Sequence, residues 1–368
     1  MLLYAFAISD KVEPKMTGAF MFVRDSWYVA GWSEQIGREP VGYIMLNEPV
    51  VLFRKKDSTP VALEDRCAHR RLPLSKGKVV GDHIECGYHG LVYGDTGACI
   101  HVPGQSPVPP YLKVRTYPVL DRHGCIWVWM GDPTRADPTA IPDLSSGHLG
   151  WGDKQRLHVK CHYQLISDNL GDLSHLAYVH AANVGNTALA EHGEIETTVS
   201  DNQVVIARWT LGRPPPPTYR EVAGFNAPID RWQISHFFAP SFFRLTFGAA
   251  SAGRGRDALN HPNRWGFCIW QWSTPETERT SHYYWAGAPN FGPERDTRGA
   301  ALYFPQQRIV VGEDIAIFEA QQTAIDLDPD APVGRIMADA AVIAARDMVT
   351  RLVAAEKRKC DEHSRPNP

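Results

Sequence analysis

The sequence predicts an α+β chain with an N-terminal all-β module followed by a larger domain in which an antiparallel sheet is flanked by helices. Three observations support this prediction. Short runs of β-branched and aromatic residues, separated by Gly, Pro and Asp, fill residues 27–133. Helical spacing and strand alternation both occur in residues 141–360. The 368 residues also exceed what one ordinary core fills, so two domains are expected.

The composition excludes several classes of protein. With 43% apolar and 21% charged residues, the chain has enough apolar material for buried cores and lacks the charge excess of a disordered protein. Lys and Arg number 38 and Asp and Glu 41, so no nucleic-acid partner is expected. No apolar run reaches the about 18 residues that cross a bilayer, so no membrane span is expected. The seven scattered cysteines favour reduced thiols or metal ligands over a disulfide framework.

Residues 1–21 are expected to form a loose N-terminal extension. The apolar stretch MLLYAFA has no basic region before it and falls short of a signal-peptide core. We therefore expect a cytoplasmic protein whose biological start is Met1, Met16 or Met21, with patterned sequence beginning at Phe22.

The β module is expected to hold several short strands. They are predicted at residues 42–46, 50–54, 60–64, 90–93 and 125–130. The segment 131–152 is rich in Pro, Asp, Gly and Ser and predicts a linker. The first domain is accordingly expected to span residues 22–140.

The second domain is expected to span residues 141–360. Helical spacing occurs in residues 163–180 and again in 299–357. Strands are predicted at residues 203–209, 242–247, 267–272 and 282–285. The run Pro214–Pro217 predicts an exposed loop, because proline cannot donate to a strand ladder. Residues 361–368 are expected to form a C-terminal tail.

Two cysteines and two histidines in the β module indicate a metal centre. Cys67-x-His69 is followed by Cys86-x2-His89, which puts four metal-ligating residues on two neighbouring loops. A Cys2His2 zinc site normally carries both cysteines on one loop, whereas here each loop has one Cys and one His. The mixed pattern suits a Rieske 2Fe-2S cluster, in which two thiolates hold one iron and two imidazoles the other. A structural zinc is the alternative.

A second group of ionisable residues lies between Asp168 and His180. At about 100° per residue, Asp172 and His175 share a helix face, but His175 and His180 are about 140° apart. One ion cannot bind both histidines on a regular helix, so His180 is expected at the helix end or beyond a π-type irregularity. Two histidines and a carboxylate suit a mononuclear iron with open positions for O2 and substrate.

The carboxylate of this second site must come from elsewhere in the chain. Asp314 is our choice, because it lies where a helix with apolar spacing is expected to start. Glu313 is the competing ligand. For both residues the alternative is a simple complement to the dipole at that helix N-terminus.

These motifs resemble those of the Rieske non-haem iron oxygenases, in particular the aromatic O-demethylase branch that contains the vanillate and dicamba oxygenase components. The resemblance covers residues 22–324 and includes D-N-L-x-D-x2-H-x4-H and the later E-D-x4-E-x-Q-Q. It implies a cyclic homotrimer in which the cluster of one subunit lies beside the iron of its neighbour. It also implies that Asp172 links His175 to the neighbouring subunit's His89, and that Asn169 lies near the iron.

The activity implied is O2-dependent O-demethylation of a methoxylated aromatic acid such as vanillate, with release of formaldehyde. Electrons from NADH are expected through a separate ferredoxin-type flavin reductase, because the G-x-G-x-x-A segment at Gly253–Ala258 lacks the helix of a nucleotide site. Arg244 is expected to pair with a substrate carboxylate or with a structural partner. Phe242, Gln271 and Trp285 are the further candidates for substrate contact.

Two other functions stay open. The first is a Rieske oxygenase that hydroxylates or dealkylates another aromatic or polycyclic compound. The second is a Rieske electron-transfer protein without oxygenase activity. Loss of product formation on substitution of His175 would distinguish an oxygenase from a carrier.

Overall fold

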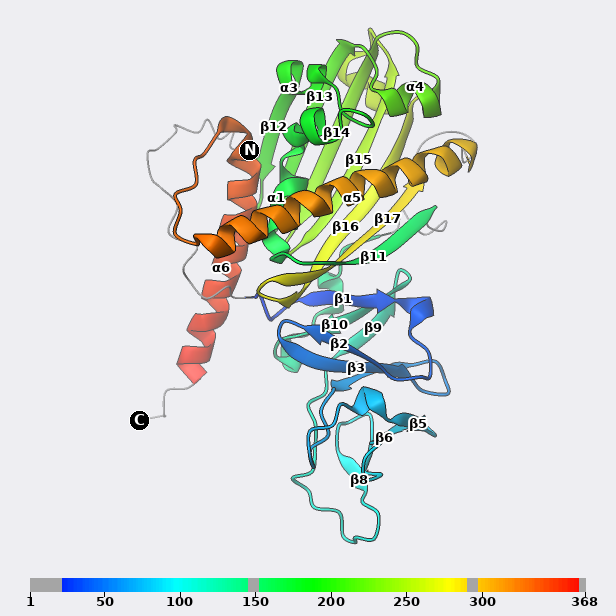
Figure 1. Ribbon diagram of the computed structural model, residues 1–368, viewed down its shortest axis with the longest axis vertical. Coiled ribbons are helices and arrows are strands. Elements are labelled where there is room, and N and C mark those ends of the chain that lie inside the picture. Colours follow the sequence, from blue (N-terminus) through cyan, green and yellow to red (C-terminus); the bar gives the residue numbers. More distant parts are fainter. Residues whose placement is uncertain (1–21, 145–151, 290–296, 364–368) are drawn as a thin grey trace. The chain divides into compact units, whose positions relative to one another are not determined.

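The computed structural model describes residues 22–144, 152–289 and 297–363, and the chain divides into two compact units. The N-terminal unit comprises Phe22–Pro142 together with Thr274–Glu278, and the C-terminal unit comprises Asp143–Ser273 and Arg279–Pro368 (Figure 1). The expected extension 1–21 and residues 364–368 of the expected tail lie outside the described residues.

The N-terminal unit consists of three small antiparallel sheets. The first contains β1 (Trp27–Trp32), β10 (Cys125–Trp129) and β9 (Val119–Arg122), and the second β2 (Val41–Met45), β3 (Glu48–Arg54) and β4 (Pro60–Glu64). The third contains β5 (Lys78–Val80), β6 (His83–Glu85), β7 (Val92–Tyr93) and β8 (Cys99–His101). Short 3-10 turns are η1 (Ser33–Gln35), η2 (Leu74–Lys76), η3 (Pro133–Arg135) and η4 (Pro138–Ala140). The all-β expectation for this unit is confirmed.

The C-terminal unit is built on a seven-stranded antiparallel sheet. In spatial order its strands are β11 (Asp153–Val159), β17 (Thr280–Pro289), β16 (Trp265–Thr277), β15 (Phe242–Ser251), β14 (Ile229–Phe238), β13 (Gln203–Arg213) and β12 (Glu194–Val199). The helices are α1 (Tyr163–Gly171), α2 (Leu176–Val179), α3 (Thr187–His192), α4 (Pro217–Ala223), α5 (Thr297–Leu327) and α6 (Ala340–His363). The 3-10 turns are η6 (Leu173–His175), η7 (Gly255–Asn260) and η8 (Met337–Asp339).

The two faces of this sheet differ in what they pack against. Strand pairing joins Gln233 to Phe247 and Leu245 to Ile269, so these side chains share one face. Helix α5 crosses the sheet on this side (Figure 1). We call this side of the sheet the α5 face. Trp232 alternates to the opposite face, where it packs in an apolar cluster with η7. Side chains on β14, β15 and β16 therefore alternate between the α5 face and the η7 side.

The proline run does not form the expected exposed loop. Pro214 is exposed, but Pro215 and Pro216 are buried and Pro217 is the first residue of α4. A proline has no N–H to leave unsatisfied in the first turn of a helix, and its fixed φ suits that position. The run thus starts a helix instead of avoiding the core. Within the described ranges, no helix is both long and apolar enough to cross a bilayer.

Candidate metal centres and substrate cavity

The loops that begin at Cys67 and Cys86 share one backbone design. In each loop the cysteine N–H donates to the carbonyl five residues further on, at 2.9 and 2.8 Å. The cysteine carbonyl accepts from the fourth residue, Arg71 at 2.9 Å and Gly90 at 3.1 Å. That fourth residue is left-handed in both loops, with φ of 63° at Arg71 and 70° at Gly90. Two loops of the same shape therefore present a Cys and a His each.

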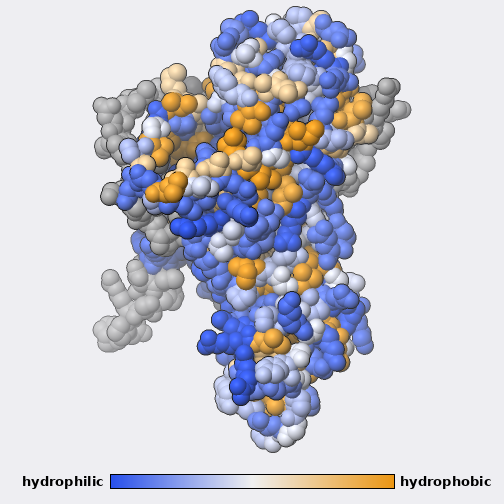
Figure 2. Space-filling view, viewed as in Figure 1, coloured by the Kyte–Doolittle hydropathy of each residue, from blue (hydrophilic) through white to orange (hydrophobic). Residues whose placement is uncertain are grey.

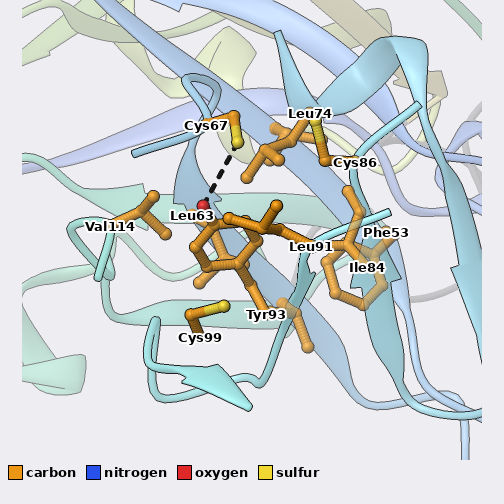
Figure 3. Packing of buried hydrophobic residues seen from close by; sticks show 12 residues of the cluster. Phe53, Leu63, Cys67, Leu74, Ile84, Cys86, Leu91, Tyr93, Cys99 and Val114 are labelled. Atoms are coloured by element: carbon orange, nitrogen blue, oxygen red, sulfur yellow. Dashed lines mark hydrogen bonds between the residues drawn. The ribbon is translucent and has the colours of Figure 1, made fainter. Parts of the chain in front are cut away.

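The cysteines of this pair are buried and the histidines are exposed. Cys67 and Cys86 are each 2% exposed in an apolar cluster that includes Tyr93 (Figure 3). The Tyr93 hydroxyl lies 3.2 Å from the Cys67 Sγ. His69 and His89 face solvent, with ring centroids 4.7 Å apart. A group bound here would have its thiolate ligands buried and its imidazole ligands exposed to solvent.

The four residues fit a two-iron cluster. Burial raises the pKa of the Cys86 thiol, so the charge of a bound metal is needed to hold it as a thiolate. Of the described residues, one group alone can hold a single metal ion, and it is His175, His180 and Asp314. The two loops therefore do not converge on one ion as a tetrahedral zinc site requires. Distribution over two irons, thiolates inside and imidazoles outside, agrees with their burial.

A break after α1 positions the two histidines of the second site. Helix α1 ends at Gly171, and Asp172 is extended, with φ of −121° and ψ of 99°. The Asp172 side chain accepts from the Ser174 N–H and so caps a new turn. Helix α2 then ends at Val179, and His180 follows it as the C-cap. The prediction that His180 lies at a helix end is confirmed. The expected continuous helix is wrong, because the cap of Asp172 interrupts it.

Asp314 lies in the middle of α5 and not at a helix start. The helix begins at Thr297 and continues through Pro305, a residue that usually ends a helix. The expectation of a helix N-terminus at Asp314 is therefore wrong, and so is the alternative in which Glu313 and Asp314 only complement a helix dipole. Their position on a long helix requires another explanation.

The ligand atoms of His175, His180 and Asp314 lie within 4.8 Å of one another. The Oδ1 of Asp314 is 3.0 Å from His180 Nε2 and 3.5 Å from His175 Nε2. Metal–ligand bonds of about 2.1 Å at right angles put ligand atoms about 3 Å apart. The three side chains can thus share one ion on one of its faces and leave its other positions open.

Hydrogen bonds fix which nitrogen of each ring faces Asp314. The Nδ1 of His175 lies 2.7 Å from the Asp172 carbonyl oxygen, and the Nδ1 of His180 lies 2.6 Å from Glu313 Oε2. Both partners are acceptors, so each Nδ1 carries the proton and each Nε2 has a lone pair for a metal. Glu313 is therefore placed as a hydrogen-bond partner of His180, and Asp314 as the third ligand.

The charges around the two rings also suit a cation. Burial lowers the pKa of His175 and outweighs the attraction of Asp314. Burial lowers the pKa of His180 too, but Asp314 and Glu313 together reverse this effect and raise it. Asp314 is only 6% exposed. A buried carboxylate that faces two imidazoles is stabilised by a metal ion between them.

Asn169 and Asp172 lie next to these ligands. The Asn169 Nδ2 donates to Asp314 Oδ1 at 3.2 Å. Asp172 reaches His175 through its backbone carbonyl, while its carboxylate accepts from a neighbouring serine and lies 3.4 Å from Arg208 Nη2. Within one chain, the Asp172 carboxylate is thus free of contact with the His175 ring nitrogen that it was expected to bind.

Comparison with known families agrees with both centres. Residues 26–118 match the Rieske [2Fe-2S] domain, and residues 159–355 match the C-terminal domain of the vanillate O-demethylase oxygenase. The chain belongs to the Rieske non-haem iron oxygenases. It is the oxygenase component of an aromatic monooxygenase or O-demethylase system, with a Rieske 2Fe-2S cluster and a mononuclear iron as its cofactors.

Individual relatives of this oxygenase cover nearly the whole chain. A toluene-4-sulfonate monooxygenase system iron-sulfur subunit of Comamonas testosteroni is 37% identical over 91% of this chain and 98% of its own length. The vanillate O-demethylase oxygenase subunit of Pseudomonas sp. (strain HR199 / DSM 7063) is 33% identical over 93% of this chain and 98% of its own. Dicamba monooxygenase bound to dicamba is similar in structure, with a TM-score of 0.81, 31% identity and coverage of 92% and 99%.

A cavity opens from the iron ligands of the oxygenase. The cavity has a volume of about 50 Å³. Apolar walls come from Leu173, Leu176, Leu245, Phe247, Ile269 and Val310. Polar groups come from Tyr219, Arg231, Gln233, Gln271, Tyr303 and Gln307. The site is therefore a mainly apolar chamber with a few polar anchors.

Only one of the four residues expected to contact substrate lines this cavity. Gln271 lies on the α5 face and is part of the wall. Arg244 and Phe242 lie on the opposite face, because side chains alternate along β15. There the Arg244 guanidinium lies 5.7 Å from the Trp270 ring centroid, and Phe242 stacks on Trp272 at 5.6 Å. These two residues pack on the far side of the sheet.

Trp285 also lies outside the cavity wall. Its Nε1 donates to Gln155 Oε1 at 3.1 Å, and its ring stacks against Phe304 of α5 at 6.4 Å. Sequence reasoning missed Arg231 and Gln233, which do line the wall. The signal that could have found them is the pairing register of β14 and β15, which puts Gln233 opposite Phe247. That register is a long-range property that local patterning does not reveal.

Proposed function

We propose that this oxygenase removes the methyl group of a methoxylated aromatic acid such as vanillate. One oxygen atom of O2 enters the methyl carbon and the other leaves as water, two electrons come from NADH through a separate ferredoxin-type flavin reductase, and the products are a phenol and formaldehyde. The observation that carries the proposal is the mainly apolar cavity that includes His175, His180 and Asp314 and has a few polar anchors in its wall.

The residues of the chain prepare this site for an aromatic ring. When bound, the cluster supplies electrons and the iron supplies a place for O2 activation on its open face. Leu173, Leu245 and Phe247 line the cavity, and in the proposed complex they exclude water and contact the ring faces. Asn169 and Glu313 hold Asp314 and His180 in the orientation that leaves the open positions toward the cavity.

A second candidate is hydroxylation of the methyl group of an arene sulfonate. The toluene-4-sulfonate monooxygenase subunit, at 37% identity, is somewhat more similar to this chain than the vanillate subunit, at 33%. Both reactions attack a carbon outside the ring of an anionic arene, so the same cavity suits either. The difference lies in the anionic group and in whether an oxygen joins the attacked carbon to the ring.

The test is product analysis with the enzyme holding both cofactors, NADH and a ferredoxin-type reductase. Formaldehyde and the matching phenol from vanillate are expected, and a benzylic alcohol from toluene-4-sulfonate would establish the second candidate. Lack of product from both compounds would refute the proposal. His175→Ala is the control, because an oxygenase loses product formation with it while a pure electron carrier keeps its cluster spectrum and its electron transfer unchanged.

We also propose that the enzyme works as a homotrimer in which Asp172 connects His175 to the neighbouring subunit's His89. Leu302, Ile309 and Ile317 support association, because they lie exposed on nearly one side of α5. Figure 2 shows apolar side chains along the course of this helix. Light scattering is expected to give three times the chain mass. Asp172→Asn is expected to slow reoxidation of the cluster by O2 and substrate while leaving both metals bound. A monomeric active enzyme would contradict this arrangement.

A further inference from the structure

Arg231 is a buried cation without an anion beside it. Its side chain comes from β14 on the α5 face, is 3% exposed and lines the cavity. The Nε and Nη1 atoms have no hydrogen-bond acceptor, and none of the carboxylates in the described residues forms an ion pair with this guanidinium. Burial of an unpaired charge is costly, so the position calls for a partner that the protein itself does not supply.

Two side chains near the Arg231 guanidinium carry hydrogen-bond donors that have no acceptor. Its Cζ lies 4.7 Å from the centroid of the Tyr219 ring, and the buried Tyr219 hydroxyl has no acceptor for its own proton. Burial raises the pKa of Tyr219 and outweighs the opposite effect of the Arg231 guanidinium, so this hydroxyl stays protonated and able to donate. The Trp265 ring lies 4.8 Å from that of Tyr219, and its Nε1 also has no acceptor. Several unused donors thus gather at one place.

The acidic residue next in the chain does not neutralise Arg231. Asp230 precedes it on β14, so its side chain points to the other face of the sheet. There its carboxylate accepts the N–H groups of Gly212, Arg254 and Gly255, at 2.6 to 2.7 Å. These three bonds occupy Asp230 on the far side and leave the cation in the cavity uncompensated.

Arg231 and the iron ligands belong to different ends of the cavity. On β14, Arg231 lies four residues before Ser235, which pairs with Leu245. Leu245 packs against the cluster that contains Leu173, two residues from His175. Four strand residues span about 13 Å. A benzene ring held between the two ends has one substituent at the cation and the opposite substituent toward the metal.

We propose that Arg231, assisted by the Tyr219 hydroxyl, binds the anionic group of the substrate and so selects aromatic acids. Two oxygens of a carboxylate or sulfonate match the fork of a guanidinium. The inference rests on the proposed function, since it names the residue by which the substrate of that site is held. Arg231 is then the specificity-determining arginine, and it takes the role that the sequence suggested for Arg244.

Direct binding tests this proposal without turnover. Calorimetric titrations use the full-length enzyme with both metal sites loaded, without O2 or reductant, and three probes: 4-methoxybenzoate, toluene-4-sulfonate and the neutral ester methyl 4-methoxybenzoate. The wild-type enzyme is expected to bind at least one of the anions about tenfold or more tighter than the ester. Arg231→Gln is expected to weaken that anion about 100-fold and to change ester binding by less than about twofold.

Three variants serve as comparisons. Arg231→Lys keeps the charge without the fork and is expected to fall between wild type and Arg231→Gln. Arg244→Gln removes an arginine from the opposite face of the same sheet and is expected to leave all three affinities unchanged. Tyr219→Phe is expected to weaken the anion by several-fold while the ester binds as before.

Three results would overturn the proposal: no preference of the wild-type enzyme for either anion over the ester, equal loss of anion and ester in Arg231→Gln, or unchanged anion binding in that variant. If Arg231→Gln does not fold, the wild-type preference and Tyr219→Phe decide, and the proposal falls unless both behave as expected. The proposed function fails separately. If an anion depends on Arg231 but neither methoxyarene nor toluene-4-sulfonate is oxidised, the anion site stands and the proposed reaction does not.

Discussion

Glu313 is expected to control the affinity of the mononuclear site for Fe(II), although it is not a ligand. Its carboxylate accepts from His180 Nδ1 at 2.6 Å, and its side chain is 32% exposed. Partners of this kind change metal affinity by about 10- to 100-fold, which equals about 1.4 to 2.7 kcal/mol. Because water reaches Glu313 and the amide of Glu313→Gln still accepts a hydrogen bond, we expect the lower end, about tenfold, for this variant. Glu313→Ala is expected to approach 100-fold.

The assay is an anaerobic Fe(II) titration against a competing chelator, on enzyme whose mononuclear site has been emptied and whose cluster spectrum shows a folded N-terminal unit. Glu191→Gln is the matched control, since this side chain is 67% exposed on α3 and pairs with His192, which is not a ligand. Asp314→Asn is expected to abolish binding. Wild-type affinity in Glu313→Gln would refute the reasoning. Retained binding in Asp314→Asn with loss in Glu313→Gln would make Glu313 the ligand.

Three further predictions concern the cluster, the helix contacts and the glycines. Cys86→Ala is expected to lose the visible and EPR signals of the Rieske cluster. Cys99 is a buried cysteine outside the two loops, so Cys99→Ala is expected to keep both signals. A zinc site would show neither signal in the wild-type protein. Arg346→Ala removes the α6 guanidinium that binds a carboxylate of α1, and we expect the free energy of unfolding to fall by about 1 to 2 kcal/mol. Calorimetry should then show the Tm of the C-terminal unit about 2 to 8 °C lower. An unchanged Tm would contradict this prediction. Gly248→Ala is expected to destabilise the protein by about 1 to 3 kcal/mol in urea unfolding, because the new Cβ would lie 2.3 Å from a backbone oxygen. In Gly312→Ala the new Cβ meets no atom within 4 Å, so this variant in α5 should stabilise the protein by up to about 1 kcal/mol.

Local chemistry made the metal sites predictable. Cys67, His69, Cys86 and His89 are close in sequence, so their spacing alone indicates a shared group. The helical angle between His175 and His180 predicts a helix end, and the structure has α2 end just before His180. Short-range geometry of this kind depends on a few neighbouring residues, so the sequence alone predicts it.

Long-range geometry was not predictable in the same way. Arg244 and Arg231 lie on neighbouring strands and both fit an alternating pattern, yet only Arg231 lines the cavity. Which face of a strand meets the iron depends on the strand pairing and on the helix that covers the sheet. The prediction placed Asp314 at the start of a helix, whereas α5 begins at Thr297 and continues through Pro305, a residue that usually stops a helix. Packing along the sheet is a tertiary effect that overrides this local preference.

Helix α5 explains how one site can serve different substrates. Tyr303, Gln307, Val310 and Asp314 follow the spacing i, i+4, i+7, i+11 and line the cavity together. Asp314 must stay, because it is the carboxylate that faces the two histidines. The other three positions of the stripe lie about 6 to 16 Å along the helix from it and can change without altering the ligand set. Substitutions at these positions, combined with the choice of residue at Arg231, can thus alter which aromatic compound fits while iron binding stays the same.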